Sequence, residues 1–89
     1  MPRKSILNEV EIAVLVALNG KTGGALSAHF SEEAIVATFR SDLRGRIKEA
    51  LDSLARNPNG FVYIKPTRGG RTYGIAPNGV NKLRELKLA

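Results

Sequence analysis

A basic cluster surrounds two adjacent glycines in the last third of the chain. Lys65, Arg68 and Arg71 lie beside the Gly69-Gly70 pair, and no acidic residue occurs between residues 60 and 81. Arginine and lysine side chains bind phosphate oxygens, and a tight turn can hold them on a narrow projection. A surface turn that serves only solubility more often mixes its charges. We therefore expect Lys65, Arg68, Gly69 and Arg71 to contact DNA or RNA.

A second candidate surface lies on residues 40–56. Apolar residues from Leu43 to Leu54 recur at helical spacing and predict an amphipathic helix over 41–56, with Ser41 as its N-terminal cap. Only the N-terminal half of a helix in the DNA major groove reaches base edges. The residues of that half that point away from the apolar stripe are Ser41, Arg44, Gly45 and Lys48.

Individual residues of this surface suit different contacts. Arg44 is the candidate for a base contact, because its planar fork matches the two acceptors of guanine. Lys48, Arg46 and Arg40 are candidates for phosphate contacts, which position a protein without reading its sequence. Gly45 either lets the helix approach a sugar-phosphate backbone closely or is simply tolerated on a solvated face. Charges opposite an apolar stripe are also typical of any surface helix.

The composition narrows the function classes. The 89 residues allow one domain, and the net charge of +6 favours a polyanionic partner. The chain has no cysteine, which excludes disulfides and thiolate chemistry. His29 is the only histidine and no base is placed beside any serine, so we expect no enzyme, no catalytic residue, no metal site and no cofactor. No small-molecule ligand is evident. No apolar run is long enough to span a membrane, and we expect a cytoplasmic, nucleoid-associated protein.

The remaining elements must place these two surfaces. Before helix 41–56 the sequence allows either one kinked helix or two short ones, and we favour two, the second capped by Ser31. A two-stranded hairpin is not stable alone and must pack against the helices. The other expected elements are a helix from Asn8 to about Leu18 that ends at Asn19-Gly20, a helical turn over 25–29, a helix over 31–39, strands over 61–65 and 71–75, and a helix over 78–88.

Two segments of the chain carry a family pattern. One runs from Ile47 to Leu54, before a turn that contains glycine, and the other from Gly70 to Gly79, where a strand gives way to a turn and a helix. Together they resemble winged-helix transcriptional regulators. The small size, the absence of cysteine and the bare domain are similar to regulators and chromatin-associated proteins of archaea and their viruses. The resemblance covers roughly residues 8–88. It implies an α+β fold, a winged helix-turn-helix with a three-helix core, a two-stranded hairpin as the wing and a C-terminal helix.

The chain departs from the family pattern between Gly24 and Ser41, where the connection is longer than the usual compact helix and tight turn. The resemblance therefore does not decide which segment is the supporting helix. Residues 1–5 are expected to be a flexible basic N-terminus of a single domain over 1–89.

Charge and resemblance together predict double-stranded DNA binding, with helix 41–56 in the major groove and hairpin 61–75 as a wing. We expect a transcriptional regulator that acts as a homodimer, because the first helix and helix 78–88 carry more apolar surface than one small core needs. Two alternatives stay open. One is a non-specific architectural or chromatin protein on DNA, and the other is a winged-helix module that docks onto other proteins.

Overall fold

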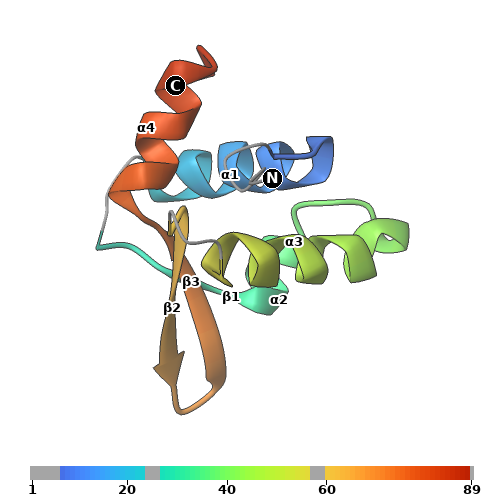
Figure 1. Cartoon of the computed structure of the whole chain (residues 1–89). Coiled ribbons are helices and arrows are strands. Elements are labelled where there is room, and N and C mark those ends of the chain that lie inside the picture. Colours follow the sequence, from blue (N-terminus) through green and yellow to red (C-terminus); the bar gives the residue numbers. More distant parts are fainter. Residues whose placement is uncertain (1–6, 24–26, 57–59, 89) are drawn as a thin grey trace.

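The computed structural model describes residues 7–23, 27–56 and 60–88, and in these ranges the chain forms four α-helices and a three-stranded antiparallel sheet (Figure 1). The α+β class expected from the sequence is therefore confirmed. In chain order the elements are α1 (Glu9–Thr22), β1 (Phe30–Ser31), α2 (Glu32–Val36), the 3₁₀ turn η1 (Ser41–Leu43), α3 (Arg44–Arg56), β2 (Val62–Thr67), β3 (Gly70–Ile75) and α4 (Pro77–Glu85).

Helix α1 begins where the sequence predicts and ends later. The Asn8 side chain accepts from the Glu11 backbone N–H at 2.8 Å, and the Asn8 N–H donates to Glu11 Oε1 at 3.0 Å, which forms a capping box. The predicted end at Asn19-Gly20 is wrong, because α1 continues to Thr22 and stops at Gly23. Gly23 takes a left-handed φ of 63°, the conformation that closes helices. Gly20 lies inside the helix, between the buried residues Leu18 and Thr22.

The segment before α2 differs from expectation. Of the predicted helical turn over 25–29, residues 25 and 26 lie outside the described residues, and residues 27–29 are not helical. Phe30 and Ser31 instead form strand β1, opposite Tyr73 and Thr72 of β3. A strand of two residues is too short to show an alternating pattern, so the sequence does not reveal it.

Helix α2 corresponds to part of the predicted helix 31–39. Ser31 Oγ accepts from the Ala34 N–H at 3.1 Å, as expected for a cap. The helix ends at Val36, before the predicted end, and the next residues continue as hydrogen-bonded turns to Phe39. Neither two short helices nor one kinked helix describes residues 27–40, where the structure has a strand followed by a single short helix.

Helix α3 keeps its predicted apolar stripe but not its predicted start. Ile47, Leu51 and Leu54 are at most 1% exposed and pack in the core. The first turn is 3₁₀, closed by the Leu43 N–H donating to the Arg40 carbonyl at 2.9 Å, and the α-helix begins at Arg44. Ser41 lies inside that turn and makes no side-chain hydrogen bond among the described residues, so the predicted Ser41 cap is wrong.

Strands β2 and β3 form the predicted hairpin, and they are longer than predicted. The pairing runs from Val62 opposite Ile75 to Thr67 opposite Gly70, which leaves a two-residue loop. Strand β3 lies in the middle of the sheet, in the order β1-β3-β2. The base of the hairpin joins the core through Val62 and Ile75, whereas its far half projects below the helices (Figure 1).

Helix α4 closes the structure. It begins at Pro77, one residue before the predicted 78–88, and ends at Glu85. Proline suits the first helical position because its missing N–H has no partner there in any case. Gly79 lies so close to the Phe61 carbonyl that a β-carbon would not fit, which brings α4 against the start of the hairpin. In the described part of the chain, no helix has the length and apolar character needed to cross a membrane.

Candidate nucleic-acid interface

The hairpin tip holds three basic side chains in solvent. Residues 64–71 are all exposed, and among the described residues no ion pair involves Lys65, Arg68 or Arg71. Arg68 occupies the two-residue loop itself, beside Gly69. The tip is ordered by its own strands, because Thr67 Oγ1 donates to the Gly70 carbonyl at 2.8 Å. These cations are therefore available to an outside anion.

The base of the hairpin is anchored on both faces. On one face the buried Tyr73 lies opposite Ile64, and on the other Tyr63 lies opposite Gly74. The Tyr63 ring occupies the space that a side chain at position 74 would need, and its hydroxyl donates to the Ala28 carbonyl at 3.3 Å. A firm base with an unpacked tip fixes where the three cations point from the domain.

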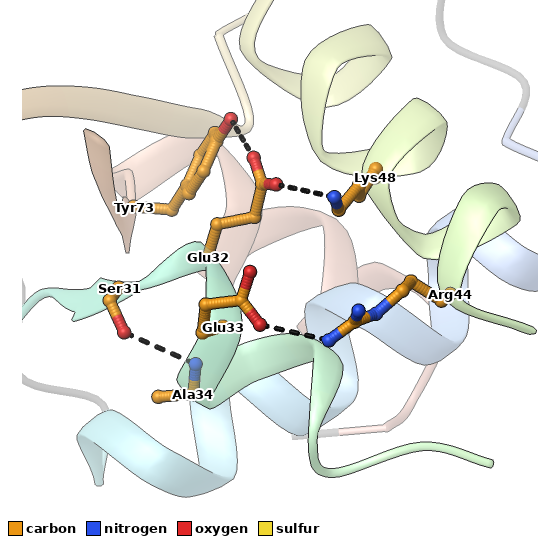
Figure 2. Close-up of polar contacts among 7 residues, drawn as sticks. All are labelled: Ser31, Glu32, Glu33, Ala34, Arg44, Lys48 and Tyr73. Atoms are coloured by element: carbon orange, nitrogen blue, oxygen red, sulfur yellow. Dashed lines mark hydrogen bonds and ion pairs between the residues drawn. The ribbon is translucent and has the colours of Figure 1, made fainter. Parts of the chain in front are cut away.

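The cations of α3 are placed differently. Arg44 Nη2 lies 2.9 Å from Glu33 Oε1, and Lys48 Nζ lies 3.6 Å from Glu32 Oε2 (Figure 2). Both carboxylates come from the first turn of α2, where the helix dipole also favours negative charge. The candidate base contact Arg44 and the candidate phosphate contact Lys48 are thus held by the neighbouring helix.

Two further arginines of this region also form ion pairs, whereas Arg46 forms none among the described residues. Arg40 pairs with Asp42 at 2.9 Å, and at the far end of α3 Arg56 pairs with Asp52 at 3.0 Å. Arg46 is exposed and takes part in no ion pair within the described ranges. Ser41 and Gly45 are exposed as well, and a side chain at position 45 would meet open space, so nothing in the fold itself requires glycine there.

The local charge balance separates the two surfaces. Residues 31–56 contain five basic and five acidic side chains, so the segment that carries α2, η1 and α3 has no net charge. The hairpin contains three basic side chains and no acidic one. Ion pairs and balance together make the hairpin, rather than α3, the stronger attractor for a polyanion.

Glu32 links the helices to the sheet. Its Oε1 accepts from the Tyr73 hydroxyl at 3.3 Å, while its Oε2 faces Lys48 (Figure 2). Burial of the Tyr73 side chain, and then the negative charge of Glu32, raise the pKa of that hydroxyl above its ordinary value of 10.0. Glu32 and Glu33 are not among the residues that the sequence predicts for this surface. Their distance from residues 44 and 48 along the chain hides the contact.

A polar pocket of about 440 Å³ lies on the other side of α3, against α1. The sequence does not indicate it. The buried Glu11 within it is already used by Asn8 and by Ser53, whose hydroxyl donates to Glu11 Oε2 at 2.6 Å. Arg46 and Glu49 complete a lining of mixed charge. Within the described residues, no three histidine, aspartate or glutamate side chains gather closely enough to hold a metal ion.

Comparisons of the chain with models of protein families, with curated proteins and with solved structures give no match.

Proposed function

We propose that the chain is a winged-helix protein that binds double-stranded DNA, with hairpin β2–β3 as its wing and α3 as the helix nearest the duplex. The order of elements supports the fold assignment: a helix, a short strand, two helices, a hairpin whose second strand pairs with the short strand, and a closing helix. On this assignment α2 is the supporting helix that the sequence left undecided.

The observation that carries the proposal is the set of unpaired cations on the projecting hairpin. Lys65, Arg68 and Arg71 bring three positive charges to a narrow tip with no carboxylate in the described residues to neutralise them. Such a tip fits along a phosphate backbone or into a narrow minor groove, where arginine is favoured. A duplex offers this groove beside the major groove, which has room for a helix.

The test compares two variants with the same charge change. Arg68→Gln/Arg71→Gln removes two cations from the wing, and Arg84→Gln/Lys87→Gln removes two exposed cations from the region of α4. Each phosphate contact contributes about fivefold to affinity at 0.15 M salt, so the wing variant should bind a duplex about 30-fold more weakly. The α4 variant should lose only a few-fold. Equal losses would contradict the hairpin as the contact surface, and unchanged affinity of the wing variant would instead favour a protein-docking module.

A second candidate is a DNA-coating protein with little sequence preference. It is favoured by the position of Lys65, Arg68 and Arg71, which make no ion pair among the described residues, because they lie on the hairpin and phosphate contacts carry no sequence information. Competition with random duplex separates the two candidates. A regulator should prefer its selected site by about 10³-fold or more, and a coating protein should show a ratio near one.

The homodimer stays a prediction attached to the regulator. Val16 on α1 is 40% exposed and Leu86, just beyond α4, is 38% exposed, and these side chains supply apolar surface for a second copy. Light scattering after size exclusion at tens of micromolar should give the mass of a dimer, and the mass of a monomer would contradict this prediction.

A further inference from the structure

The contact between α2 and α3 brings opposite charges together across two elements of the proposed DNA surface. Glu33 and Arg44 are eleven residues apart in the chain, yet their charged atoms lie 2.9 Å apart. Glu32 faces Lys48 one helical turn further along α3 (Figure 2). Two adjacent carboxylates thus meet two basic side chains spaced by four residues.

Each carboxylate is paired with a cationic side chain that a DNA phosphate would otherwise contact. A carboxylate and a phosphate both accept from the guanidinium fork of arginine with similar geometry. A duplex that approaches α3 must therefore displace Glu33 from Arg44 before a phosphate can take its place. The exchange is feasible in the folded protein, because the Arg44 and Glu33 side chains are 55% and 69% exposed.

The two carboxylates differ in how firmly they are held. Glu32 is more buried, at 27% exposure, and it also accepts from the Tyr73 hydroxyl, which ties it to the sheet. Among the described residues Glu33 has only the Arg44 contact for its side chain. Glu33 is therefore the carboxylate whose removal changes the charge at α3 with the least effect on packing.

We propose that Glu33, assisted by Glu32, is a specificity-determining residue that competes with DNA phosphates for the cations of α3. The competition lowers the affinity of α3 for the backbone of any sequence, so that α3 engages only where base contacts add to the phosphate contacts. This inference rests on the proposed DNA binding and adds to it a role for two acidic side chains on a basic protein.

The test is the affinity of Glu33→Gln for a random-sequence duplex as salt is varied, with Glu85→Gln as the matched control. Glu85 is 67% exposed and pairs with Lys82 at 3.0 Å, so the control removes an equally exposed, equally paired carboxylate from α4. Glu33→Gln should bind up to about fivefold more tightly at 0.15 M salt, with a slope of log affinity against log salt steeper by about 0.9. Glu85→Gln should change the affinity by less than about twofold.

A second substitution identifies the cation that is released. In a protein that already carries Arg44→Gln, the added Glu33→Gln should no longer tighten binding, because there is no guanidinium left to free. An equal gain with and without Arg44 would overturn the inference, as would equal effects of Glu33→Gln and Glu85→Gln.

Failure of the inference is distinguishable from failure of the proposed function. If the unsubstituted chain binds a duplex and Arg68→Gln/Arg71→Gln weakens that binding, the proposed function stands whatever Glu33→Gln does. If the unsubstituted chain does not bind a duplex at all, both are overturned.

Discussion

The hairpin tip and helix α3 both carry basic side chains, but those of α3 are mostly paired with carboxylates and those of the tip, among the described residues, are not. On α3 the side chains of Arg44, Lys48 and Arg56 lie beside carboxylates of α2 or of α3 itself. At the tip, Arg68 and Arg71 have no such neighbour within the described residues. A count of basic residues therefore overstates the attraction of α3 for a polyanion, whereas for the hairpin the count equals the number of cations that form no ion pair among the described residues.

The cause is the position of each element relative to the rest of the domain. Helix α3 packs against α1, α2 and β2, so both flanks of its exposed face border other elements. The far half of the hairpin extends past the helices and borders only solvent (Figure 1). An element at the centre of a small domain meets internal partners, whereas a projection keeps its side chains for external ones.

The contrast between the packed helix α3 and the projecting hairpin tip predicts a large difference in stability between substitutions at the two places. Leu51 is fully buried on α3, so Leu51→Ala should lower the free energy of unfolding by about 2–5 kcal/mol. Arg68→Ala at the exposed tip should change it by less than about 0.5 kcal/mol. Urea denaturation of both variants checks the contrast, and a tip substitution as costly as the core one would show that the hairpin is not free.

A smaller effect is expected at the base of the hairpin. Gly74→Ala should lower the free energy of unfolding by about 1–3 kcal/mol, because the added methyl group must displace the Tyr63 ring. Gly69→Ala is the matched control, since its methyl group enters open space on a backbone without positive φ. Thermal unfolding of the two variants should separate them clearly. Equal melting temperatures would contradict the anchored base.

The Tyr73–Glu32 contact gives a smaller, pH-dependent effect. Burial raises the pKa of the folded Tyr73 hydroxyl, so the unfolded chain loses that proton first as the pH rises. The stability contributed by neutral Tyr73 is complete below pH 10.0 and falls as the pH rises towards the folded-state pKa. Tyr73→Phe should cost about 1 kcal/mol at neutral pH through the lost hydrogen bond. The substitution should also reduce the fall in the free energy of unfolding above pH 10.0. If that fall is unchanged in Tyr73→Phe, other groups cause it.

The smallest expected effect concerns the surface ion pairs that define the α3 region. Glu33→Gln should change the free energy of unfolding by less than about 1 kcal/mol, because the Glu33–Arg44 pair is exposed on both sides. Its effect on DNA binding should be the measurable one. Loss of stability comparable to Leu51→Ala would mean that the pair holds α2 in place and does not merely occupy Arg44.

Elements with a strong local signal could be predicted from the sequence. The start of α1 at Asn8, the apolar stripe of α3 and the two strands of the hairpin each depend on residues that are close together in the chain. Strand β1 could not be predicted, because two residues become a strand only by pairing with Tyr73 and Thr72. The same reason hides the Tyr63–Gly74 contact.

The sequence predicts which basic residues make up the candidate site, but it does not predict which of their charges are paired with carboxylates. The basic residues of the hairpin stand out because no acidic residue lies near them in sequence, and among the described residues none of them forms an ion pair. For α3, the pattern identifies Arg44 and Lys48 but not Glu33 and Glu32, since the contact depends on the crossing of two helices. Whether a charge is free is a property of tertiary structure.

We propose that the hairpin supplies the phosphate contacts to DNA, whereas ion pairs with carboxylates neutralise Arg44 and Lys48 of α3. The most direct measurement is the salt dependence of duplex affinity for Arg68→Gln/Arg71→Gln beside that for Arg44→Gln/Lys48→Gln. Two lost phosphate contacts reduce the slope of log affinity against log salt by about 1.8. We expect this reduction for the hairpin variant and less than about half of it for the α3 variant. Equal reductions, or a larger one for the α3 variant, would contradict it.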